Sequence, residues 1–98
     1  MWARFLPLIE ERVGLLESAA AACAAGRLSI EQQQAACAAA HKLAGVLGTF
    51  SLSEGTYLAR ELEGMYSGQS APDPATGARL ISMAAELRAI VRNRKPAR

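Results

Sequence analysis

His41 is the single histidine of the chain, and the residues that would surround it on a helix are small. At about 100° per residue, Leu43, Val46, Leu47 and Phe50 fall on the opposite side and form an apolar stripe. The residues within roughly 60° of His41 are Gln34, Cys37, Ala38, Gly45 and Gly48. Apart from the glutamine, none is larger than cysteine. The pattern therefore predicts an exposed imidazole on a cleared helix surface.

Gly45 and Gly48 would lie in the interior of this helix, where each costs about 1 kcal/mol relative to alanine. Because they lie on the His41 side, close packing against a neighbouring helix does not explain them. They leave room for a large partner or a hydrated phosphoryl group to approach the imidazole. A lone helical histidine is more often a solvated surface residue, so the pattern alone leaves that alternative open.

Cys23 and Cys37 do not form a recognisable metal-binding pattern, and one histidine leaves such a site short of ligands. As isolated thiols in alanine-rich stretches they are typical of small core residues in a reducing compartment. The sequence shows no nucleophile–base pair of a hydrolase. We therefore expect no metal site and no enzyme activity of the chain's own.

The composition indicates one all-α domain spanning residues 1–98. The chain has 98 residues, 51% of them hydrophobic, its alanine runs favour helix, and no long stretch alternates apolar and polar residues as a strand would. Four of its 11 basic residues lie in a tail at 91–98, which we expect to be frayed. With 5% aromatic residues and no basic stripe elsewhere, we expect no nucleic-acid partner.

The N-terminal residues do not match a signal peptide, because Glu10, Glu11 and Arg12 interrupt any apolar segment. No apolar run approaches the ~20 residues of a membrane span. The expectation is a soluble, cytoplasmic protein with no membrane partner.

Apolar residues spaced three and four apart predict a first helix that begins at about Leu6 and ends at Gly26. We expect Pro7 in its first turn, and Trp2 and Phe5 ahead of the helix. A second helix should begin at a capping box formed by residues 29 and 32 and continue to 49 or 50.

Ser51 and Ser53 are the candidate N-caps of a third helix, which we expect to end at Gly68. Asp73 followed by Pro74 is typical of the N-cap and first residue of a fourth helix. Four amphipathic helices joined by short turns need one shared core. The predicted fold is an antiparallel up-down-up-down four-helix bundle.

Residues 40–52, Ala-His-Lys-Leu-Ala-Gly-Val-Leu-Gly-Thr-Phe-Ser-Leu, resemble the phosphoacceptor helix of histidine-containing phosphotransfer (HPt) domains. The family pattern is His, any residue, Leu, often Lys, then Gly and two small residues, with a Gly-Thr-Phe-Gly-like ending in one subgroup. The family includes the phosphoacceptor module of chemotaxis histidine kinases. Residues 58–63 look like the family's following helix.

The resemblance implies a phosphorelay carrier that acts as a monomer. A response-regulator receiver domain would dock on the second and third helices and donate the phosphoryl group of its aspartyl phosphate to Nε2 of His41. A histidine kinase acting in trans is the other donor to consider. The carrier would have no cofactor of its own, with Mg²⁺ held by the receiver. The alternative is a non-catalytic helical module that binds receiver or kinase domains.

The resemblance also suggests roles for neighbouring residues. Glu63 matches a glutamate that bonds to Nδ1–H in the chemotaxis kinases, although it could instead lie on the wet face of the third helix. The family's lysine three residues after the histidine is Ala44 here, so Lys42 or Arg60 is the candidate replacement. Ser51 stands where the family usually has glycine. Gln34, Ala38, Lys42, Gly45, Gly48 and Arg60 are the predicted supporting and docking residues.

Overall fold

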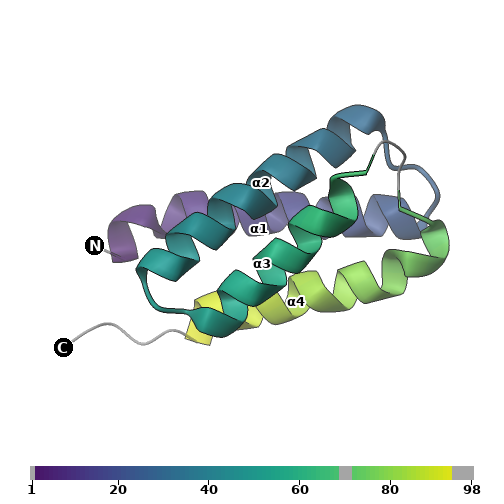
Figure 1. Ribbon diagram of the computed structural model, residues 1–98. Helices are drawn as coiled ribbons and strands as arrows, with labels where there is room; N and C mark the ends of the chain where they lie inside the picture. The colour runs from purple at the N-terminus through teal and green to yellow at the C-terminus, as the bar shows by residue number, and fades with distance from the viewer. Residues whose placement is uncertain (1, 69–71, 94–98) are drawn as a thin grey trace.

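The computed structural model describes residues 2–68 and 72–93, and all regular structure in these ranges is helical. Neighbouring helices run in opposite directions along the bundle, as Figure 1 shows, and α1 packs against both α2 and α4 while α3 closes the ring. The predicted all-α four-helix bundle is confirmed. The elements are α1 (Trp2–Ala24), α2 (Ile30–Thr49), α3 (Ser53–Tyr66), a 3₁₀ turn η1 (Pro74–Thr76) and α4 (Gly77–Asn93).

Each helix contributes its apolar stripe to one core. The largest fully buried aliphatic side chains come from all four helices: Ile9, Leu16, Leu43, Leu47, Leu62, Leu80 and Leu87. Helix α2 adds mainly alanines, including Ala36, Ala40 and Ala44. Such small side chains let a neighbouring backbone approach closely, and α2 and α3 form the most extensively packed pair.

The structure confirms that Gly26 ends α1 and that the side chain of Ser29 caps α2. Gly26 has φ of 72°, the left-handed conformation that glycine adopts without steric cost. Its amide donates to the carbonyl of Cys23 (3.0 Å), and the next amide, of Arg27, donates to that of Ala22 (2.8 Å). The Ser29 hydroxyl then accepts from the amide of Gln32 at 3.0 Å and caps α2.

Two predicted helix limits are wrong. Helix α1 begins at Trp2, so Pro7 lies inside the helix rather than in its first turn, and Phe5 does not precede it. The amide that Pro7 lacks would have reached only the exposed residue Ala3, so the helix continues. At the other end of the chain, α4 continues through Asn93, which places residues 91–93 of the expected frayed tail in the helix. Residues 94–98 lie outside the described residues.

The turn between α2 and α3 corrects a third prediction. Neither Ser51 nor Ser53 caps α3, whose N-cap is Leu52 without a side-chain hydrogen bond. Ser51 instead ends α2, with φ of 62°. Its amide donates to the carbonyl of Gly48 (3.1 Å), and that of Leu52 donates to Leu47 (2.9 Å). The same two hydrogen bonds end α1 at Gly26, but here the residue in the left-handed backbone conformation is a serine.

The end of α3 and the start of α4 differ from expectation by a few residues. Helix α3 ends at Tyr66 rather than Gly68. Asp73 accepts from the amide of Ala75 at 2.9 Å, as an N-cap should, but it caps η1, which leads into α4. At Gly77, a Cβ atom would lie 2.4 Å from the Cα of Ala24, so only glycine allows α4 to meet α1 there.

Helices α1 and α4 are also joined by an ion pair. Arg88 donates from Nε and from a terminal nitrogen to the two carboxylate oxygens of Glu17, at 2.8 and 2.7 Å. The hydrogen bonds from Arg88 lower the pKa of Glu17 below its usual value. The stabilisation of the folded state by this ion pair is therefore present at neutral pH and is lost as the pH falls through the lowered pKa.

Among the described helices, none is both long and apolar enough to cross a bilayer.

We predict that Ser51→Gly stabilises the protein by about 0.5–1 kcal/mol, because glycine removes the steric cost of the left-handed conformation. Urea denaturation followed by circular dichroism measures the change. Ser53→Gly, inside the first turn of α3, is the control and should lower stability. An unchanged or lower free energy of unfolding for Ser51→Gly would contradict the prediction.

Candidate functional site

His41 lies on the outer face of α2, with 73% of its side chain exposed to solvent. Four nearby residues of the same helix are buried in the core: Ala40, Leu43, Ala44 and Leu47. Since helical periodicity places Leu43 and Leu47 on the side opposite His41, the apolar stripe sets the orientation of the imidazole. The predicted exposure of the imidazole is confirmed.

The carboxylate of Glu63 on α3 lies beside the imidazole, with Oε2 2.9 Å from Nδ1 of His41. Leu62 and Tyr66 direct the inner face of α3 into the core, which leaves Glu63 at the edge that faces α2. The thiol of Cys37 donates weakly to the backbone carbonyl of Glu63, at 3.7 Å between sulfur and oxygen. Glu63 therefore does not lie on an isolated wet face, the alternative that the sequence left open.

This hydrogen bond selects one form of the neutral imidazole. An ionised carboxylate can only accept hydrogen bonds, so Nδ1 must carry the proton that it donates to Glu63. In the neutral ring the lone pair then lies on Nε2. No described protein group bonds to Nε2. When the ring is neutral, the arrangement thus presents Nε2 as an exposed acceptor on an oriented ring, with the Glu63 carboxylate on the other side of that ring.

The surface beside His41 is open at the two predicted glycines. A Cβ atom at Gly45 would meet no heavy atom within 4 Å. At Gly48 the nearest atom would be the hydroxyl oxygen of Thr56, at 3.8 Å. Neither glycine is needed for helix packing, since both positions have room for a methyl group. Their effect is to keep the surface around the imidazole low.

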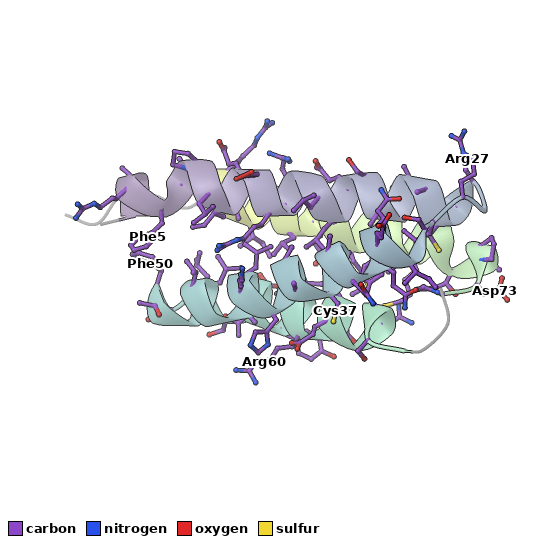
Figure 2. All side chains as sticks on the ribbon, turned by 90° about the horizontal axis from the view of Figure 1, so that it is seen from above. Phe5, Arg27, Cys37, Phe50, Arg60 and Asp73 are labelled. Atoms are coloured by element: carbon purple, nitrogen blue, oxygen red, sulfur yellow. The ribbon has the colours of Figure 1, made fainter. Side chains whose placement is uncertain are left out.

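The two candidate cations border different hollows beside His41. Arg60, on the side of the bundle that faces away from α1 in Figure 2, lines a hollow together with His41, Ala44, Gly45 and Glu63. Neither Arg60 nor Lys42 has a carboxylate within 4.0 Å among the described residues.

Lys42 lines a second hollow between α2 and α1, with Arg12 and the aromatic pair Phe5 and Phe50. The two rings, whose centres are 6.0 Å apart, pack edge to face and lie next to each other at the ends of the two helices in Figure 2. Lys42 also borders the longer groove between α2 and α3, which His41 shares. It therefore stands at the boundary between two surfaces rather than beside Ala44.

Gln34 and Ala38 are exposed and lie along this longer groove, which extends from His41 towards Ile30 and Ser67. The groove is open to solvent and adjoins the hollow at Arg60 through His41 and Glu63. Of the predicted supporting residues, Gln34, Ala38 and Lys42 line the groove, and Gly45 and Arg60 line the hollow, while Gly48 lies farther along α2 in a third hollow that Arg60 also borders. In the part of the chain that the structure describes, no three His, Cys, Asp or Glu side chains are grouped as a metal site requires.

Gln33 is a structural residue that the sequence analysis missed. It is only 4% exposed, and its side-chain amide donates to the carbonyls of Tyr66 (3.1 Å) and Gly68 (2.9 Å). These bonds hold the end of α3, just beyond Glu63, against α2. Its position between two other glutamines concealed it, because the triplet resembles a solvated stretch.

Tyr66 is buried next to the hydrogen bonds of Gln33, and its hydroxyl group has no hydrogen-bond partner among the residues that the structure describes. Burial raises the pKa of Tyr66 to about 12. The phenol therefore remains neutral at physiological pH, and its ring serves the packing of α3.

The model of the Hpt domain family matches residues 1–90 of this chain. The chain is also similar to the protein RcaC of Microchaete diplosiphon, with 34% identity over 73 residues, which is 74% of this chain but 11% of RcaC. It thus corresponds to a small part of that relative. No solved structure matches the chain.

The family match spans all four helices, including the exposed histidine and the carboxylate bonded to its ring. Hpt domains are phosphocarriers rather than catalysts, and they interact with the kinases and receivers of two-component systems. The chain belongs to the Hpt domain family and has a role in phosphorelay phosphotransfer.

Proposed function

We propose that Nε2 of His41 accepts a phosphoryl group from the aspartyl phosphate of a receiver domain, or from a histidine kinase in trans, and passes it to a response-regulator receiver. The hydrogen bond between Nδ1 and Glu63, at 2.9 Å, is the observation that supports this most directly. It leaves the lone pair on Nε2, and 73% of the histidine side chain is exposed to an incoming partner.

In the transfer, the lone pair of Nε2 attacks phosphorus while the bond from phosphorus to the aspartyl oxygen breaks. The carboxylate leaves with the bonding electron pair, and the phosphoryl group becomes attached to nitrogen. The proton on Nδ1 stays in place, and the charge of Glu63 stabilises the positive charge that develops on the ring. Delivery to the next receiver is the same step in reverse.

Such a transfer depends on positioning and on charge stabilisation, much of which the partner supplies. In this proposal the chain has no nucleotide or metal site, and the receiver contributes its own bound Mg²⁺. Gln34, Ala38, Gly45 and Gly48 form the low surface on which the receiver docks, with Lys42 at its border. The protein acts as a cytoplasmic monomer.

The transfer itself can be measured with radioactive phosphate. We expect the wild-type protein, mixed with a phosphorylated receiver or a histidine kinase and ATP, to acquire label that is acid-labile and alkali-stable. His41→Gln should acquire none, because the chain has no second histidine. Absence of label on the wild type across a panel of receivers and kinases, with binding retained, would contradict the carrier role and favour the docking module.

Removal of the Glu63 carboxylate should slow phosphorylation of His41. We expect Glu63→Ala to reduce the transfer rate about 10- to 100-fold, the range seen when the hydrogen-bond partner of a metal-binding histidine is removed. Glu63→Gln, which keeps an acceptor oxygen but loses the charge, should fall between this variant and the wild type. Rapid-quench kinetics with a phosphorylated receiver measures the rate.

Glu61→Ala is the matched control for Glu63, since Glu61 on the same helix contacts Arg79 and Tyr57 rather than His41. Its transfer rate should equal that of the wild type. If Glu63→Ala also transfers at the wild-type rate while remaining folded, the carboxylate does not orient the ring.

A substitution at Gly45 can separate docking of the receiver from phosphorylation of His41. Gly45→Met should fold, because nothing lies within 4 Å of its Cβ position, and its helix should be more stable by up to about 1 kcal/mol. We expect its transfer rate from a receiver to fall at least tenfold, and phosphorylation by the small donor phosphoramidate to fall by much less. Ala85→Met, on the exposed face of α4, is the control and should behave as wild type. Unchanged transfer in Gly45→Met would show that the receiver does not approach this surface.

A further inference from the structure

Arg60 differs from Arg79 and Arg88 of α4, each of which contacts a carboxylate on a neighbouring helix. Arg79 lies 3.8 Å from a carboxylate oxygen of Glu61, and Arg88 forms two hydrogen bonds with Glu17. Arg60 is exposed and has no ion pair within the described residues. It lies three residues before Glu63 on the same helix, yet the two side chains do not pair.

The hollow that Arg60 lines exists because the residues of α2 beside it are small. On α2 the hollow is bordered by Ala44, which is 6% exposed, and by Gly45, which has no Cβ. His41 and Glu63 complete its border. Because Nδ1 is occupied by Glu63, a group bonded to the ring must be attached at Nε2, next to this open space.

Phosphorylation would add about two negative charges and three acceptor oxygens at this place. The carboxylate of Glu63 is already there, so a second anionic group requires a compensating cation. Guanidinium suits the task because it offers parallel N–H groups that match two phosphoryl oxygens. Lys42 lies about 100° around α2 from His41 and borders both the α1 side and the groove between α2 and α3, but it does not line the hollow that Arg60, His41 and Glu63 share.

Resting on the proposed function of His41, we propose that the guanidinium of Arg60 binds the phosphoryl oxygens of phosphorylated His41. The residue is unpaired in the unmodified protein so that it is available to the phosphorylated one. It stabilises the phosphorylated state against hydrolysis and holds the phosphoryl group in the hollow between α2 and α3.

The test loads the purified full chain with phosphoramidate and follows phosphohistidine by ³¹P NMR as the pH is varied. Arg60 in contact with the phosphoryl group favours its dianion, so Arg60→Gln should raise the midpoint of the titration by roughly half a pH unit or more. Arg60→Lys, which keeps the charge, should restore part of the shift. The half-life of phosphohistidine should also be at least twofold shorter in Arg60→Gln than in the wild type.

Arg79→Gln is the control for loss of one positive charge at a distance, and its midpoint should stay at the wild-type value. Circular dichroism verifies that each variant is folded. A wild-type midpoint in Arg60→Gln, or a shift that appears in Lys42→Gln instead, would overturn the assignment of Arg60 while leaving His41 as the carrier. If phosphoramidate, receivers and kinases all fail to modify the wild type, the proposed function fails, and the assignment of Arg60 with it.

Discussion

The site depends on one contact between two helices, the hydrogen bond that joins Nδ1 of His41 to the carboxylate of Glu63. The two residues are 22 positions apart, so the bond forms only if α2 and α3 hold a fixed distance and register. Alanines on the inner face of α2 permit the close approach. Gln33 binds the end of α3 at one end of the pair, and the turn at Ser51 joins the helices at the other. The packing thus determines which nitrogen of the ring is free.

The surface around His41 on α2 and α3 is open, whereas α1 and α4 are joined by close contacts on the other side of the bundle. On the α1–α4 side, Gly77 packs directly against the backbone of Ala24, and Glu17 and Arg88 form an ion pair with two hydrogen bonds. On the α2–α3 side, Gly45 sits in a helix interior with open space around it. A glycine there costs helix stability, and the well-packed opposite side offsets that cost. The bundle can therefore present a low, open surface to a partner without losing its fold.

The fold and the exposure of His41 could be predicted because both follow from periodicity within a helix. The contact with Glu63 could not, since helical spacing says nothing about which residues of two helices meet, and only the family resemblance suggested it. Likewise, Gly77 and Gln33 owe their roles to atoms distant in sequence. The turn at Ser51 was misread because a serine before a helix is usually a cap, whereas here the preceding helix determined its conformation.

The central claim is that Glu63 fixes the proton on Nδ1 and leaves Nε2 as the nucleophile. The ¹⁵N chemical shifts of the imidazole of His41, measured by long-range ¹H–¹⁵N NMR at neutral to mildly alkaline pH, test it most directly. The account predicts that the neutral ring is protonated at Nδ1 in the wild type, with an unprotonated Nε2, and that this preference is lost in Glu63→Ala. A neutral ring protonated mainly at Nε2 in the wild type would contradict the account.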